Sequence, residues 1–92
     1  MNDVIILKLI NGDEMICQLV GENDNYVDVD RPRLMTIQPT KDGQGQFGLI
    51  PFLLSNPDAR NLPIAKSAIV TRLSASADMS KAYMSTVSGL VL

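Results

Sequence analysis

The first thirty residues alternate between apolar runs and short polar breaks, a pattern typical of consecutive β-strands. Residues 4–10 are apolar and mostly β-branched except at Lys8, which predicts a strand covered on both faces. Residues 14–20 place Met, Cys and Leu side chains on one face, and residues 26–30 alternate between valine and aspartate. The pattern therefore predicts an antiparallel meander whose third strand turns its valines inward and its carboxylates outward.

Two polar connections separate these three strands. Asn11-Gly12 lies between apolar runs, and both residue types tolerate positive φ, which predicts a hairpin with a type I′ turn. Gly21 and the polar residues 22–25 predict the second turn.

The middle of the chain predicts a bend followed by a hairpin. Pro32 cannot donate a hydrogen bond to a sheet, so residues 31–33 are expected to form a bulge or an edge where the strand bends. The strand pattern resumes over residues 34–38. Two glycines within residues 41–46 predict an exposed hairpin loop, and the apolar residues 47–54 predict the next strand.

The end of the chain changes from strand to helix. Residues 61–64 and 68–74 complete the strands, and the apolar period then lengthens, which predicts a helix over about residues 77–88. Ser76 can cap the start of this helix, and Gly89 stands where a C-terminal glycine belongs. The apolar stripe of this helix consists of Met79, Ala82, Tyr83, Thr86, Val87 and Leu90.

A chain of 92 residues is expected to be a single domain, because a second core would need roughly 50 more residues. We therefore expect a mainly β fold: a small, strongly bent antiparallel barrel of five to six strands over about residues 3–75. One C-terminal α-helix packs on that barrel or on a neighbouring copy, since a helix of about twelve residues is marginal alone.

The residue types argue against catalysis. The chain has no histidine and no glycine-rich phosphate loop before a helix, and its serines have no visible base to activate them. We predict no enzyme activity, no catalytic residue and no cofactor. The single cysteine, Cys17, shares a strand face with Met15 and Leu19, which favours core packing over a reactive thiol.

A metal site and a membrane segment are also not predicted. The carboxylates of Glu22, Asp24, Asp28 and Asp30 lack the spacing of a calcium loop and are expected to form a solvated strand face. The apolar residues 4–10 are too few to span a bilayer, and no leader pattern opens the chain. With one cysteine and no possible internal disulfide, we expect a cytoplasmic protein with no membrane partner.

Charge is unevenly distributed along the chain, although the net charge is only −2. Residues 1–30 carry a balance of −6, and residues 31–92 carry a balance of +4. Folding either interleaves the two parts into a mixed surface, or leaves opposed patches that help copies associate head to tail.

The order of strands and glycines resembles the Sm-like family, which comprises the Sm, LSm and bacterial Hfq proteins. The segment at residues 64–70, IAKSAIV, is similar to the second family motif. The residues that fit the first motif are Leu9, Gly12, Ile16, Leu19, Gly21, Val29 and Asp30. Within the family, the chain looks most like small Sm-like proteins of marine tailed phages, through INGDEMICQLVG, DRPRLM, FGLIPFLLSNPD and KAYMSTVSG. The resemblance implies an SH3-like barrel and a homo-oligomer, such as a ring, formed through strand edges.

The sequence also departs from the family pattern. Sm-like proteins usually begin with a helix, whereas this chain places its helix last, and Cys17 stands where the family has a second glycine. The family binds RNA through an Asp…Asn pair flanking an aromatic residue and through an Arg-Gly pair. Here the first region reads NDNY at residues 23–26, and the second reads Ala65-Lys66.

The resemblance therefore makes four residues candidates for binding single-stranded RNA. Tyr26 could stack on a base, Asn23 and Asn25 could read its edge, and Lys66 could meet a phosphate. The alternative is a polar turn with a half-buried tyrosine. A basic surface repeated round a ring, which would offset the acidic chain, would come from Arg31, Arg33, Lys66 and Arg72.

Two functions remain open from the sequence. The first is a non-enzymatic Sm-like binding or assembly module that binds RNA as a homo-oligomer. The second is a protein-interaction or structural module that binds no nucleic acid.

Overall fold

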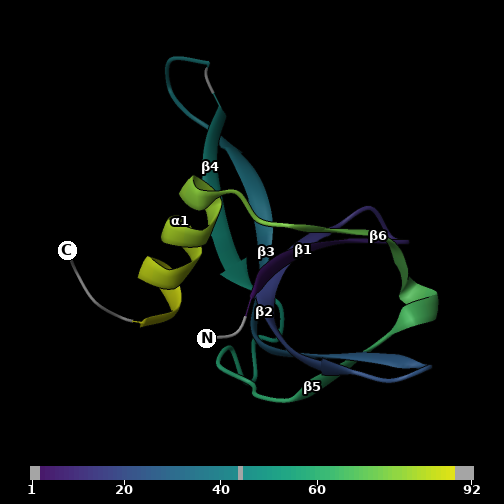
Figure 1. Cartoon of the computed structure of the whole chain (residues 1–92). Coiled ribbons are helices and arrows are strands. Elements are labelled where there is room, and N and C mark those ends of the chain that lie inside the picture. The colour runs from purple at the N-terminus through teal and green to yellow at the C-terminus, as the bar shows by residue number, and fades with distance from the viewer. Residues whose placement is uncertain (1–2, 44, 89–92) are drawn as a thin grey trace.

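The computed structural model describes residues 3–43 and 45–88, which form six strands, one short 3-10 helix and one α-helix (Figure 1). In chain order the elements are β1 (Val4–Leu9), β2 (Glu14–Glu22), β3 (Tyr26–Pro39), β4 (Gly45–Pro51), β5 (Leu62–Ala65), η1 (Lys66–Ala68), β6 (Ile69–Ser74) and α1 (Ala77–Ser88). The mainly β fold and the C-terminal helix are confirmed.

All strand pairs are antiparallel, and the sheet runs in the order β4-β3-β2-β1-β6. The long strand β3 has two partners along the same chain: residues 33–39 pair with β4, and residues 26–29 pair with β5. Strands β5 and β6 are connected through η1, but within the described residues no hydrogen-bonded ladder joins them. The sheet is strongly curved but not closed into a barrel (Figure 1).

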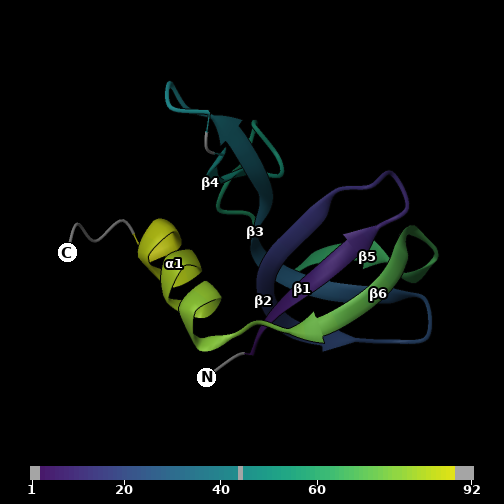
Figure 2. The same cartoon turned by 90° about the horizontal axis from the view of Figure 1, so that it is seen from above.

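The predicted bend lies at the start of the second half of β3. Ile16 pairs with Arg33 and Gln18 pairs with Asp30, so two residues of β3 oppose one residue of β2, which is a β-bulge. Arg31 within the bulge adopts a φ of 48° and donates its backbone N–H to the carbonyl of Ala59 at 2.7 Å. Beyond the bulge, β3 and β4 project from the curved part of the sheet as a two-stranded arm (Figure 2).

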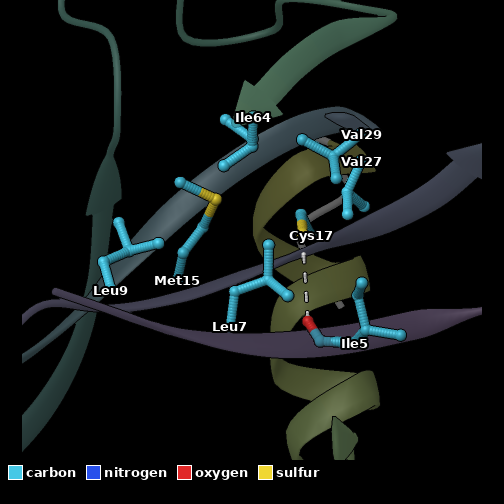
Figure 3. Close-up of a cluster of buried hydrophobic side chains, with 8 residues drawn as sticks. All are labelled: Ile5, Leu7, Leu9, Met15, Cys17, Val27, Val29 and Ile64. Atoms are coloured by element: carbon cyan, nitrogen blue, oxygen red, sulfur yellow. Dashed lines mark hydrogen bonds between the residues drawn. The ribbon is translucent and has the colours of Figure 1, made fainter. Parts of the chain in front are cut away.

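The core lies inside the curve of the sheet, where side chains from four strands point toward one another (Figure 3). Its members are Ile5, Leu7, Leu9, Met15, Cys17, Val27, Val29 and Ile64. The Cys17 thiol is fully buried, and burial raises its pKa to about 12. This burial confirms the prediction that Cys17 packs in the core, and a thiol with so high a pKa forms little of the nucleophilic thiolate.

Helix α1 lies on the side of the molecule away from η1 (Figures 1 and 2). Ser76 caps the helix as predicted, since its Oγ accepts a hydrogen bond from the Met79 N–H at 3.2 Å. Tyr83 is fully buried, and its single hydroxyl proton is shared between the backbone carbonyls of Asp30 and Arg31, which lie 3.0 and 2.9 Å from the hydroxyl oxygen. The predicted Gly89 cap and Leu90 lie outside the described residues.

Two expectations about local structure are wrong. Gly12 adopts a φ of 97°, but Asn11 does not have a positive φ, so the first turn is not type I′. Gly12 N–H donates to the Leu9 carbonyl at 2.9 Å, which produces a three-residue loop with glycine at the bulge position. Asp30 does not point into solvent: it is 7% exposed, and its Oδ1 accepts a hydrogen bond from the Asn61 N–H at 2.8 Å.

Folding interleaves the acidic and basic parts of the chain. Three ion pairs join residues 1–30 to residues 31–92: Asp30 with Arg60, and Glu22 with both Lys66 and Arg72. These contacts support the mixed-surface interpretation. In the part of the chain that the structure describes, no helix combines the length and apolar character needed to cross a membrane.

Candidate functional site

The turn between β2 and β3 is held by its own first residue. The side-chain oxygen of Asn23 accepts hydrogen bonds from the N–H groups of Asn25 and Tyr26 at 2.8 and 2.9 Å. The Asn23 backbone N–H donates to the Tyr26 carbonyl at 2.9 Å. An asparagine at the start of a turn commonly bonds the backbone two residues later. The oxygen of Asn23 is therefore committed to the turn rather than presented to a ligand.

The 3-10 helix η1 brings the fourth candidate to this turn. Tyr26 pairs with Ala65 across β3 and β5, and the next residue, Lys66, donates its backbone N–H to the Asn25 carbonyl at 2.9 Å. The structure thus joins residues 23–26 to Lys66, although the two segments are far apart in the sequence.

Beside this junction, one carboxylate pairs with two cations. Glu22 Oε2 lies 3.0 Å from Lys66 Nζ, and Glu22 Oε1 lies 3.1 Å from Arg72 Nη1. Hydrogen bonds from Lys66 and then from Arg72 hold the pKa of Glu22 below its ordinary value. We call these three residues the Glu22 triad. Together with Val27 and Ile69 they line a shallow surface hollow.

The four RNA candidates do not form one surface. Val27 lines the hollow, and its neighbour Tyr26 points to the opposite face of β3, because successive strand residues alternate. Tyr26 is 44% exposed there, and Asn25 is exposed at the turn. Lys66 lies with the triad. A base stacked on Tyr26 and a phosphate bound by Lys66 would therefore lie on different sides of the β2–β3 hairpin.

The proposed basic surface is only partly present. Arg33 is 6% exposed, and its guanidinium donates to the Asp58 carboxylate at 2.9 Å and to the Pro57 carbonyl. Arg31 Nη2 donates to the side-chain oxygen of Gln18. The prediction that Arg33 lies on this surface is wrong, because its charge is needed to tie the loop at residues 52–61 to β3.

Sequence reasoning missed the role of Glu22. It counted this residue only as one carboxylate of a solvated strand face. Its partner Arg72 is 50 positions away in the sequence, so no local spacing could have indicated the contact. The sequence did show that Glu22 ends a strand next to a turn. Long side chains at such a position can reach the side chains of neighbouring strands.

Within residues 3–43 and 45–88, no group of three or more histidine, cysteine or acidic side chains could hold a metal ion. Compared with known proteins, the chain matches no protein-family model and no curated protein sequence. The Sm-like resemblance therefore stays a prediction that rests on the motifs of the chain itself.

Proposed function

We propose that this chain is a non-enzymatic assembly module of the Sm-like type that self-associates through the strands at the two ends of its sheet. The observation that carries this proposal is the exposure of β6. Five of the six residues of β6 are exposed, and these include Val70 at 65% and Leu73 at 54%. An exposed edge strand with apolar side chains favours pairing with another chain.

The other end of the sheet path has the same character. Strand β4 is mostly exposed, with Phe47 at 44% and Ile50 at 38%. Because β4 and β6 are different strands, pairing β4 of one copy with β6 of the next is a head-to-tail contact. Repeated contacts of this kind form a ring if the rotation from each copy to the next closes on the first copy. The family resemblance favours the ring.

A barrel within each subunit is consistent with this assembly. Strands β5 and β6 lie beside the same core, since Ile64 of β5 belongs to it and Ile69 of β6 packs against it. The three residues of η1 connect them. This arrangement supports the proposal that the sheet wraps around the core as an SH3-like barrel that stays open between β5 and β6, which leaves the outer edge of β6 available for another copy.

Size-exclusion chromatography with light scattering tests the assembly. The double variant Val70→Lys/Leu73→Lys should weaken association by about a hundredfold, since burying each side chain contributes about 1.5 kcal/mol. The double variant Ile10→Lys/Leu54→Lys is the matched control, because Ile10 is 71% and Leu54 is 86% exposed, both lie outside the strands, and the same two charges are added. A monomeric wild-type protein at micromolar concentration would contradict self-association, and a double variant as large as wild type would contradict the role of β6.

Single-stranded RNA binding is the second candidate function. One observation favours it: the bond between Lys66 N–H and the Asn25 carbonyl joins an exposed aromatic turn to a cationic one. Opposing it, Glu22 pairs with both Lys66 and Arg72, which lowers their combined charge from +2 to +1. If RNA is not bound, the assembly serves a protein-interaction or structural role.

Binding of fluorescent U-rich and A-rich RNA at low salt tests this second function. Tyr26→Ala should weaken binding about tenfold, through loss of one stacked base, and added salt should weaken it further. Leu54→Ala is the control, because Leu54 is an apolar residue that is 86% exposed in a loop outside β4, β6 and the turn that carries Tyr26. No detectable binding by the wild-type protein, or equal losses in both variants, would contradict the role of Tyr26.

A further inference from the structure

The Glu22 triad has the geometry of an occupied anion site. Its two cations come from different elements, Lys66 from η1 and Arg72 from β6, and they hold the two oxygens of one carboxylate at 3.0 and 3.1 Å. A phosphate group presents oxygens of the same charge to such donors, and lysine and arginine recognise both groups through charge-assisted hydrogen bonds. Glu22 therefore occupies the positions that phosphate oxygens would take.

The triad is accessible to a ligand. The side chains of Glu22, Lys66 and Arg72 are 37%, 39% and 41% exposed, and they border the surface hollow that also includes Val27 and Ile69. Ion pairs this exposed contribute little to stability, because water and salt screen them. A polyanion can compete with the Glu22 carboxylate without disrupting the core.

We propose that Lys66 and Arg72 form a binding site for the phosphate backbone of single-stranded RNA, and that Glu22 keeps this site closed in the free protein. Binding opens the site when an RNA phosphate displaces the carboxylate. This inference rests on the RNA function proposed above, and it adds a regulatory residue. It also accounts for the acidic residue beside the cations of a candidate RNA site. A ligand must displace the carboxylate, so weakly binding monovalent anions are excluded.

The key variant is Glu22→Gln, which retains the side-chain shape but releases both cations. The same phosphate contacts form in wild type and in Glu22→Gln, so the salt slope, about 0.7 for each contact, should be similar in the two proteins. Wild type must also break the two exposed ion pairs of Glu22, each worth up to about fivefold in affinity, so we expect Glu22→Gln to tighten binding of U-rich RNA about tenfold.

Glu14→Gln is the matched control. Glu14 lies on the same strand, is 51% exposed and pairs with Lys8 at 3.6 Å, so the variant makes the same change of charge at the opposite end of β2. Its affinity should change by less than about twofold. Adding Lys66→Ala and Arg72→Ala to Glu22→Gln should remove the gain, and circular dichroism checks that each variant is folded.

The outcomes separate this inference from the proposed function. Tighter binding by Glu22→Gln alone supports the closed site, including the case in which the wild type binds no RNA. If wild type and Glu22→Gln bind equally, or if Glu14→Gln tightens binding as much, the regulatory role is overturned and RNA binding stands. If neither protein binds RNA, both proposals are overturned. Binding of inorganic phosphate by Glu22→Gln without RNA binding overturns RNA as the ligand.

Discussion

Replacing Tyr83 tests how helix α1 is held to the sheet. Tyr83 is the one buried residue among the twelve that form the helix. Its ring is fully buried, and its hydroxyl reaches the carbonyls of Asp30 and Arg31 at the start of the bulge in β3. One side chain thus joins the helix to the bulge. Arg31, whose carbonyl Tyr83 contacts, is the bulge residue with a positive φ.

The two parts of the side chain can be separated. Tyr83→Phe removes the donor for two buried carbonyls and should lower the free energy of unfolding by about 1–2 kcal/mol. Tyr83→Ala also removes the ring and leaves a cavity, so the loss should reach about 4 kcal/mol. Because a domain of this size is stable by roughly 5–15 kcal/mol, the second variant should be close to unfolding.

Urea denaturation followed by far-ultraviolet circular dichroism measures both losses. Met84→Ala is the control, because Met84 is the next helix residue and is 37% exposed, so its loss should stay below about 1 kcal/mol. A loss in Tyr83→Ala no larger than in Met84→Ala would refute the anchoring role of the ring. A Tyr83→Phe protein as stable as wild type would refute the contribution of the hydroxyl.

Three further predictions concern pH, backbone conformation and a buried carboxylate. Burial raises the pKa of Tyr83 to about 12. The folded state therefore keeps a proton that the unfolded state loses above about pH 10, so stability should fall as pH rises from about 10 to 12, and less so in Tyr83→Phe, by denaturation at each pH. Gly12→Ala should lower the free energy of unfolding by about 1–2 kcal/mol in urea denaturation, because alanine is strained at the φ of 97°. A Cβ at this position meets no other atom, so the backbone strain is the whole cost. Asp30→Ala should cost about 1–3 kcal/mol by leaving the Asn61 N–H without its acceptor, whereas Asp28→Ala, on the solvent side of the same strand, should cost less than about 1 kcal/mol.

Local patterns predicted the elements well because the forces behind them are local. Alternation of apolar side chains placed Val27 and Val29 in the core, and Pro32 marked the bulge because it cannot donate to a ladder. Ser76 marked the start of the helix because a hydroxyl at that position satisfies a free N–H group. Each of these predictions depended on residues within a few positions of one another.

Apart from the type of the first turn, the failures involve contacts between distant segments. Asp30 and Arg33 follow a strand pattern that predicts exposure, yet both are buried, because the loop at residues 52–61 folds over them. Asn61 donates to Asp30, and Asp58 accepts from Arg33. Whether such a loop covers a strand depends on hydrogen bonds that form only after folding, so periodicity carries no information about it.

The separation of the helix from the Glu22 triad has a consequence for testing function. Tyr83, Asp30 and Arg33 are buried at the bend, where Tyr83 contacts β3 and the other two bond to the loop at residues 52–61, so changes there act mainly on stability. Lys66 of the triad belongs to η1, which lies on the side of the molecule away from the helix (Figure 1), and the exposed ion pairs of the triad contribute little to folding. A change in binding caused by Glu22→Gln can therefore be attributed to the site itself. The same reasoning makes an altered binding affinity in a Tyr83 variant uninformative unless its stability is measured in parallel.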